Sequence, residues 1–209
     1  TQKPRHLNSA VQSGWATMMP AAQIFASPLT IDAQWNPKPY LAEKFILSDD
    51  SRSVTLHLRK DAKFHDGRAV TSQDFIYSFE RATDSKLGST TADTYLGDIA
   101  GVLDKLSGKS QSVAGIKATD PHTLQIDLEG PRAYFLAKLQ YPTAYVVDKA
   151  NVESGKTWTE KPNGTGPFKL TRWDKSSKIT LERNADYHLE PAKVQRVQFN
   201  LAGGNPRTM

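Results

Sequence analysis

Three short motifs carry side chains that could take part in chemistry. Gly108-Lys109-Ser110 and Gly155-Lys156-Thr157 resemble the end of a phosphate-binding P-loop. A P-loop has a further glycine five residues before the glycine of that triplet, and both segments lack it. The adjacent carboxylates Asp49 and Asp50 point apart in a strand or a turn, so they form no acid–base pair. None of these motifs predicts catalysis.

Histidine and cysteine usage argues against a metal centre and a nucleophile. The five histidines, at positions 6, 57, 65, 122 and 188, lack the spacing of a metal site such as HExxH. Cysteine is absent, which excludes disulfides, thiolate chemistry and cysteine-type zinc sites. No GxSxG segment occurs. We therefore expect no metal, no cofactor and no enzymatic activity.

The charge of the chain is scattered. Its 209 residues include 27 basic and 22 acidic side chains, a net charge of +5, with never more than two basic residues adjacent. Such mixing favours a solvated surface over a nucleic-acid-binding face. Hydrophobic residues make up 38 % of the chain, which is ordinary for a soluble globular domain with a sizeable core. We see no signal peptide and no apolar run long enough to span a bilayer.

The elements that would position functional residues are best defined at residues 41–67. Phe45-Ile46-Leu47 is apolar, and Asp49–Arg52 has the composition of a turn. Apolar and polar residues then alternate along Ser53–Leu58, with Val54, Leu56 and Leu58 on one face. This pattern predicts a β-hairpin whose second strand is half buried.

A turn and a capped helix are expected directly after this hairpin. The turn is Phe64–Gly67, in which glycine can take a positive φ without steric cost. Thr71 is expected to cap the helix, with Asp74 as the acidic partner of a capping box. Phe75, Phe79 and Ala82 then recur at helical spacing.

The rest of the chain indicates short elements of both kinds. Two more hairpins are predicted, from Ile116–Thr119 with Thr123–Leu128 and from Phe168–Trp173 with Ile179–Arg183. Helices are expected within Ala21–Leu29, Tyr95–Leu106, Arg132–Leu139 and Asp148–Ser154, and single strands at Tyr145–Val147 and Val194–Leu201. Strict βαβ alternation and low-complexity linkers are absent, so we expect an α/β lobe with a mixed sheet.

The hairpin, turn and capped helix also resemble a known family. The segment LAEKFILSDDSRSVTLHLRKDAKFHDG, followed by VTSQDFIYSFER, is similar to the signature of the extracytoplasmic solute-binding proteins of ABC importers, in their peptide-binding group. Asn163–Phe168, NGTGPF, is similar to another segment of that family. Residues 92–101 and 106–109 are most similar to its oligopeptide-binding subgroup. The resemblance extends from about Leu7 to Asn205.

The resemblance implies a domain organisation. It predicts a lobe of the periplasmic-binding-protein type II-like fold, with residues 1–34 as the first part of lobe I. Residues 35–139 would form an inserted hairpin-and-helix subdomain, and residues 140–209 the second part of the lobe. The second lobe, the C-terminal return strands and the family's first strand would lie outside this sequence. We expect the sheet edge left exposed in this way to favour self-association.

The resemblance also implies a ligand site. It places Ser13, Gly14, Trp15 and Ala16 at the mouth of the cleft, and Tyr95 and Tyr141 beside a bound peptide. Gly164, Thr165 and Gly166 would bring backbone amides close to the ligand. The residues themselves allow other roles: Trp15 as a core or lid aromatic, the tyrosines as packing residues, and the glycines as a tight crossing between chain segments.

The function implied by the resemblance is capture of extended oligopeptides for delivery to the transmembrane subunits of an ABC permease. An extended peptide can add to a strand, so main-chain hydrogen bonds provide affinity without sequence preference. The expected location is periplasmic or extracytoplasmic, which is compatible with a lipid anchor on a longer parent protein. Alternatives are a receptor for a nickel chelate, haem or an oligosaccharide and, more distantly, a stand-alone enzyme or nucleic-acid-binding module.

Overall fold

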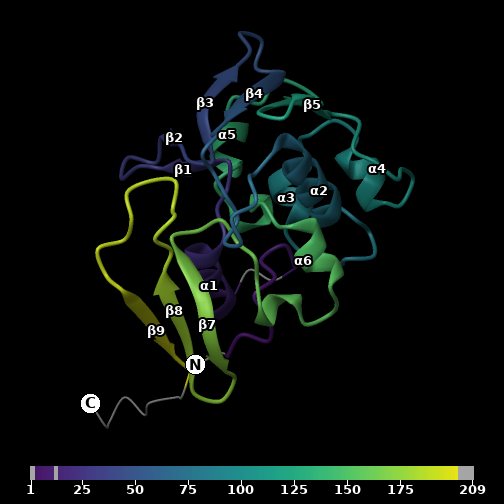
Figure 1. Cartoon of the computed structure of the whole chain (residues 1–209). Coiled ribbons are helices and arrows are strands. Elements are labelled where there is room, and N and C mark those ends of the chain that lie inside the picture. Colours follow the sequence, from purple (N-terminus) through teal and green to yellow (C-terminus); the bar gives the residue numbers. More distant parts are fainter. Residues whose placement is uncertain (1–2, 12–13, 202–209) are drawn as a thin grey trace.

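The structure is a computed structural model, and it describes residues 3–11 and 14–201. Its strands form three sheets (Figure 1). The four-stranded sheet has the order β3 (Ala42–Leu47), β4 (Ser53–Leu58), β6 (Thr123–Asp127), β5 (Ile116–Asp120). The three-stranded sheet contains β7 (Phe168–Asp174), β8 (Lys178–Arg183) and β9 (Arg196–Asn200), and β1 (Leu29–Ile31) pairs with β2 (Pro37–Pro39).

Every strand pairing among the described residues is antiparallel. The expected mixture of parallel and antiparallel pairing is therefore wrong for this part of the chain. Short turns join most of the paired strands, and a short turn can connect only antiparallel neighbours. The three hairpins that the sequence predicted are confirmed.

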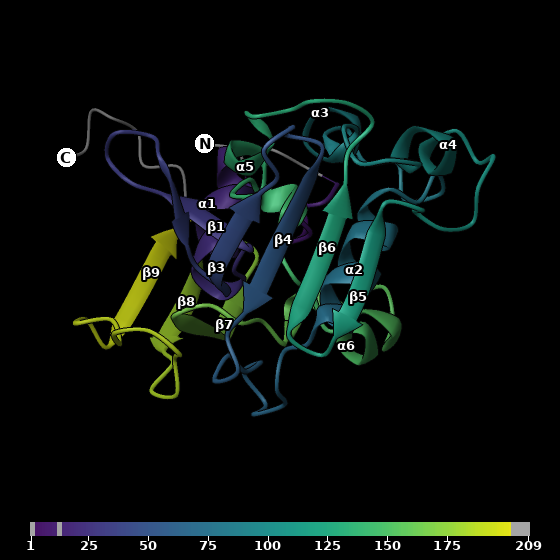
Figure 2. The same cartoon turned by 90° about the horizontal axis from the view of Figure 1, so that it is seen from above.

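The four-stranded sheet buries one face against helix α2 (Ser72–Ala82) (Figure 2). Residues of β4 alternate between buried and half-buried as predicted, with Val54, Leu56 and Leu58 inside. The predicted capping box is also present, because the Thr71 backbone N–H donates to Asp74 Oδ2 at 2.8 Å. This face of the sheet and α2 form the first of two clusters of buried side chains.

The three-stranded sheet packs beside helix α1 (Trp15–Ile24) and encloses the second cluster (Figure 1). Ile24 and Phe25, at the end of α1, are buried there against strand residues such as Ile179 and Leu181. Ala10 and Ala26 belong to the first cluster, although they lie in the segment 1–34. The two clusters therefore match the expected division of the chain only roughly. The division into 1–34, 35–139 and 140–209 stays a prediction.

Two predicted helices differ from the observed ones. The helix expected within Ala21–Leu29 begins earlier, at Trp15, and ends at Ile24, where the Gly166 N–H donates to the Ile24 carbonyl at 2.8 Å. The helix expected over Tyr95–Leu106 is divided into α3 (Ala92–Leu96) and α4 (Val102–Leu106). Gly101 lies between them at φ 84°, a left-handed conformation that interrupts a right-handed helix.

The remaining connections are short. The strand predicted at Tyr145–Val147 is irregular chain, since Val146 donates to the Ala26 carbonyl and Val147 to Ser78 Oγ without any strand partner. The other helices are α5 (Phe135–Lys138), η1 (Pro142–Ala144), α6 (Lys149–Glu153) and η2 (Trp158–Glu160). Among the helices of the described residues, none combines the length and apolar character needed to cross a bilayer.

The β1–β2 hairpin, which the sequence did not predict, holds Trp35 in a strained backbone conformation. Trp35 has φ 66° and is 75 % exposed at the tip. Asp32 Oδ1 accepts hydrogen bonds from the N–H groups of Gln34 and Asn36, each at 2.9 Å, and Lys38 lies 3.2 Å away. The hydrogen bond from Asn36 is the main cause that lowers the pKa of Asp32 to about 2. This bonding holds a bulky residue where asparagine or glycine is normally found.

We expect Trp35→Asn to stabilise the chain by about 0.5–1 kcal/mol, because asparagine tolerates the left-handed conformation that costs a bulky residue roughly 1–2 kcal/mol. Urea denaturation would measure the change. Trp35→Phe keeps a bulky side chain at the same φ and serves as the matched control. An asparagine variant no more stable than the phenylalanine variant would contradict the assignment of strain.

Candidate functional site

The first turn of α1 and the end of β9 together line an open, mostly apolar hollow. Its volume is about 510 Å³. The lining residues are Gly14, Trp15, Ala16, Met19 and Pro20 from the α1 side and Phe199, Asn200 and Leu201 from the β9 side. Trp15 is 77 % exposed, so it is not a core residue in this structure. Gly14, Trp15 and Ala16 of the predicted corner thus border one surface, while Ser13 lies outside the described residues.

Tyr95 and Tyr141 lie face to face near the same helix. Their ring centroids are 3.4 Å apart and their planes differ by 5°. The Tyr141 hydroxyl donates to Met18 Sδ of α1 at 4.0 Å. Burial, followed by the neighbouring Tyr141 phenol, raises the pKa of Tyr95, so its hydroxyl stays protonated in neutral solution. The structure therefore joins the two predicted tyrosines to each other and to α1, in positions that remain partly exposed.

The loop Gly164–Gly166 lies at the other end of α1, against its last turn. All three residues are buried. The Gly166 N–H donates to the Ile24 carbonyl, and Thr165 Oγ1 accepts from the Ala26 N–H at 3.1 Å. A methyl group on Gly164 would come within 2.0 Å of the Ile24 carbonyl oxygen. These contacts favour the interpretation as a tight crossing between chain segments, since the loop is covered by the chain itself.

His65 fixes this glycine loop from the opposite side. Its backbone N–H donates to the Gly164 carbonyl at 2.8 Å. Its ring Nδ1 accepts from the Gly164 N–H at 3.3 Å, so the ring proton lies on Nε2, which is 3.0 Å from the Gly166 carbonyl. Burial is the main cause that lowers the pKa of His65 to about 4. The sequence indicated only a turn residue here; the hydrogen-bond geometry and the lowered pKa assign a neutral imidazole protonated at Nε2.

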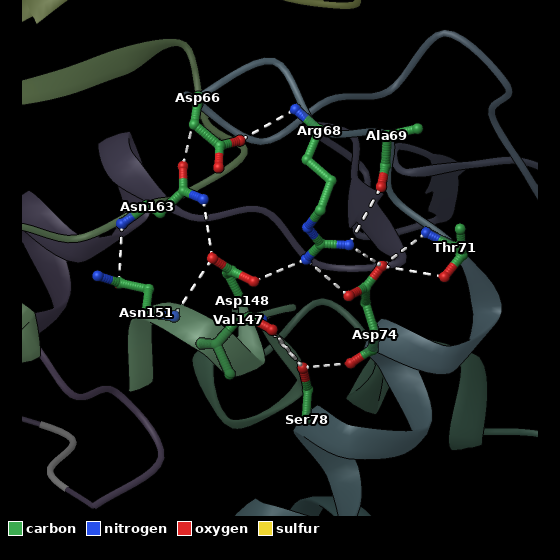
Figure 3. Close-up of polar contacts among 10 residues, drawn as sticks. All are labelled: Asp66, Arg68, Ala69, Thr71, Asp74, Ser78, Val147, Asp148, Asn151 and Asn163. Atoms are coloured by element: carbon green, nitrogen blue, oxygen red, sulfur yellow. Dashed lines mark hydrogen bonds and ion pairs between the residues drawn. The ribbon is translucent and has the colours of Figure 1, made fainter. Parts of the chain in front are cut away.

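A polar network continues from the glycine loop to α2 and α6 (Figure 3). Arg68 Nη2 lies 2.8 Å from Asp74 Oδ1 and 2.8 Å from Asp148 Oδ1. Asn163, the residue before the glycine loop, donates from Nδ2 to Asp148 Oδ2 at 2.9 Å and accepts at Oδ1 from the Asp66 N–H at 3.1 Å. The loop is therefore tied to the start of both helices.

Asp148 is the shared carboxylate of this network. Burial alone would raise its pKa, but hydrogen bonds from Asn163 and Arg68 outweigh burial and hold the pKa below its ordinary value. Asp148 also caps α6, because its side chain accepts from the Asn151 N–H. The sequence predicted the helical turn that starts here but not the partnership with Arg68. The only sequence signal was a charged residue directly after the Asp66-Gly67 turn.

The predicted site residues thus fall into two groups at opposite ends of α1. The helix has 10 residues and is about 15 Å long. Trp15, Tyr95 and Tyr141 lie toward its first half, where side chains reach solvent, and Gly164–Gly166 support its last turn. In residues 3–11 and 14–201, no group of three or more histidine, cysteine, aspartate or glutamate side chains is arranged to hold a metal ion.

Comparison with known proteins places this chain in a family. Residues 36–208 match the family described as bacterial extracellular solute-binding proteins, family 5 (middle part). The chain belongs to this family. The resemblance seen in the sequence is therefore confirmed.

The similar proteins include peptide receptors. The chain is 39 % identical over 170 residues to the periplasmic oligopeptide-binding protein OppA of Escherichia coli, covering 78 % of this chain and 31 % of OppA. It is 34 % identical over 170 residues to the dipeptide-binding protein DppE of Bacillus subtilis, covering 79 % of this chain and 31 % of DppE. The chain thus spans about a third of the length of these curated relatives.

Solved structures support the fold. The structure of the Escherichia coli murein tripeptide binding protein MppA superposes with a TM-score of 0.88 at 32 % identity, covering 96 % of this chain and 40 % of that one. Haemophilus influenzae OppA, in complex with the peptide RPPGFSPFR, gives a TM-score of 0.83 at 28 % identity, covering 89 % and 37 %. This likeness confirms the expected α/β lobe of the periplasmic-binding-protein type II kind.

We expect Gly164→Ala to destabilise the fold by about 3 kcal/mol or more, because the added methyl group would overlap the Ile24 carbonyl and push α1 away. Gly88→Ala is the control: Gly88 has φ 67° but open space around it, so only the conformational cost of roughly 1–2 kcal/mol applies. Denaturant titration of both variants measures the difference. Equal losses would show that the crossing is looser than its geometry indicates.

The neutral state of His65 makes stability depend on pH. Its folded pKa of about 4 is below the ordinary value of 6.5, so the unfolded chain binds more protons between these values. We expect the free energy of unfolding to be full above pH 6.5 and to fall steadily toward pH 4. His188, whose pKa burial also lowers to about 4, contributes to the same window. In urea titrations at several pH values, His65→Gln should show a shallower slope; an unchanged slope would exclude His65 as a cause.

Proposed function

We propose that this chain forms part of a solute-binding protein that captures peptides outside the cytoplasm and delivers them to an ABC permease. The observation that carries the proposal is the exposed aromatic surface at the first turn of α1. Trp15 borders a hollow of about 510 Å³, and the stacked Tyr95 and Tyr141 contact the same helix through Met18. The names of the similar OppA and DppE proteins support peptides as the class of ligand.

The proposed binding follows from the chemistry of this surface. Trp15, Met19 and Phe199 offer apolar area on which a peptide side chain can be buried. The Tyr141 hydroxyl already donates to Met18 Sδ, but the phenol oxygens of Tyr95 and Tyr141 can still accept hydrogen bonds from peptide N–H groups. Binding by shape and main-chain hydrogen bonding needs no nucleophile and no acid–base pair, so we expect capture without chemical change.

A second ligand class is supported by the apolar character of the same hollow. The chain is 29 % identical over 192 residues to the probable deoxycholate-binding periplasmic protein YgiS of Escherichia coli, covering 86 % of this chain and 35 % of that protein. An amphipathic steroid would place its apolar face on Trp15 and Met19. Peptide remains the first candidate, because similar proteins named for peptides include relatives of higher identity.

Titration calorimetry with a pool of tri- to pentapeptides tests the proposal in the longest polypeptide that contains this chain. We expect Trp15→Ala to weaken binding about tenfold, as removal of a central aromatic anchor often does. Trp35→Ala is the matched control, since Trp35 is similarly exposed but lies at the tip of the β1–β2 hairpin. Equal effects of the two substitutions, or no heat with peptides, would refute this site for peptides, and heat with deoxycholate alone would favour the steroid class.

The isolated chain is expected to bind much more weakly than the longer polypeptide. Small-molecule sites bury roughly 70–90 % of their ligand, whereas this hollow is open to solvent along one side. Micromolar affinity of the isolated chain would show that these residues form the complete site.

A further inference from the structure

The outer face of the four-stranded sheet carries a second hollow, which the proposed function does not use. Its volume is about 530 Å³. It is lined by Glu43, Lys44, His57, Leu58, Lys60, Asp120, His122 and Thr123. Lys44, His57 and Thr123 are register neighbours across β3, β4 and β6, so the hollow crosses three strands that lie side by side (Figure 2).

Two irregularities of the sheet shape this hollow. The register of β3 against β4 shifts between Ala42 and Lys44, and that of β5 against β6 shifts between Ala118 and Asp120. Both shifts lie at the end of the sheet where β4 finishes and β6 begins. A bulge redirects side chains and bends the strand, and bulges are frequent next to functional sites. Here the first bulge brings the neighbouring residues Glu43 and Lys44 to the same hollow.

The lining is rich in hydrogen-bond donors that lack partners. Among the described residues, Lys44 and Lys60 form no ion pair within 4.0 Å, and no side-chain hydrogen bond is made by either of them or by His57. His122 adds a ring nitrogen, Nδ1, that is buried without a hydrogen-bond partner. This nitrogen is closed to the hollow, so a ligand would reach it only after the ring turns about its Cβ–Cγ bond.

The acceptors of the hollow are fewer. Asp120 uses its carboxylate within its own turn, where Oδ1 accepts from the His122 N–H at 2.7 Å. That leaves Glu43 as the one lining carboxylate without a hydrogen bond or an ion pair among the residues that the structure describes. The Thr123 side chain also hydrogen-bonds the Asp120 carboxylate. Two ammonium groups and two imidazoles therefore share the hollow with a single free carboxylate, that of Glu43.

We propose that this hollow binds an oxyanion of the phosphate class. Lysine ammonium groups and imidazole N–H groups donate charge-assisted hydrogen bonds to phosphate oxygens, and a tetrahedral anion can accept from several strands at once. Inorganic phosphate and the headgroup of an acidic phospholipid share this chemistry. Both are small enough to enter a hollow of about 530 Å³. The site is separate from the surface proposed for peptides.

Amide chemical shifts during a titration with inorganic phosphate, at constant ionic strength set with chloride, test the site in the whole chain. We expect saturable shifts centred on residues 43–44, 57–60 and 120–123. The double variant Lys44→Ala/Lys60→Ala should weaken binding at least tenfold, and Glu43→Gln should strengthen it two- to threefold by removing the free acceptor. Both variants change exposed side chains, so folding should be unaffected.

A matched double variant, Lys86→Ala/Lys156→Ala, removes the same charge from exposed positions outside this sheet and should change the affinity less than twofold. Sedimentation with phosphatidylglycerol vesicles, beside phosphatidylcholine vesicles, distinguishes the headgroup from the free anion. Binding of either source that depends on Lys44 and Lys60 supports the site. Chemical shifts that do not saturate would overturn the proposed site. Equal losses of phosphate affinity in the two double variants would also overturn it. Peptide affinity is measured independently, so failure of this site leaves the proposed function untouched.

Discussion

The guanidinium group of Arg68 joins the two parts of the structure that contain the two clusters of buried side chains. Arg68 follows the turn after the first hairpin and contacts Asp74 at the start of α2 and Asp148 at the start of α6, each at 2.8 Å. α2 belongs to the first cluster of buried side chains, while α6 precedes the segment that leads into the three-stranded sheet. Because both carboxylates are buried, loss of the guanidinium would leave them without a countercharge, which is far more costly than loss of an exposed ion pair.

The same network sets the position of α1 indirectly. Asp148 holds Asn163, and Asn163 leads into the glycine loop that supports the last turn of the helix. His65 closes the loop from the other side with its backbone and both ring nitrogens. The last turn of α1 is held against the glycine loop, whereas its first part carries the exposed residues Trp15 and Met19. Rigidity at one end of a short helix thus orients the aromatic residues at the other.

Sequence reasoning succeeded where local patterns decide the structure. The alternation in Ser53–Leu58 and the Thr71–Asp74 capping box depend on neighbours in the chain, and both are present as predicted. It failed where distant segments decide. α1 ends at Ile24 because of Gly166, a residue 142 positions later (166 − 24), and Tyr145–Val147 is held by Ala26 and Ser78 without a strand partner. No periodicity within a segment encodes such contacts.

The candidate site shows the same difference between features that could be predicted and features that depend on distant contacts. The aromatic residues Trp15, Tyr95 and Tyr141 were named from the resemblance, and the structure groups them around α1. The glycines were named for contact with a ligand, but the missing side chain of Gly164 instead makes room for the Ile24 carbonyl. Arg68 was not singled out, since its partners lie 6 and 80 residues away. A charged residue beside a turn has no sequence feature that reveals a partner at that distance.

The crossing at Gly164–Gly166 also constrains how the chain reaches its native state during synthesis. Among the described residues, the Ile24 carbonyl accepts from the Gly166 N–H and the Ala26 N–H donates to Thr165 Oγ1, so about 140 residues must follow before either contact can form. At ~5–20 residues per second this interval is on the order of ten seconds. Throughout that time the last turn of α1 lacks its native support, so this part of the chain can reach its final structure only late in synthesis.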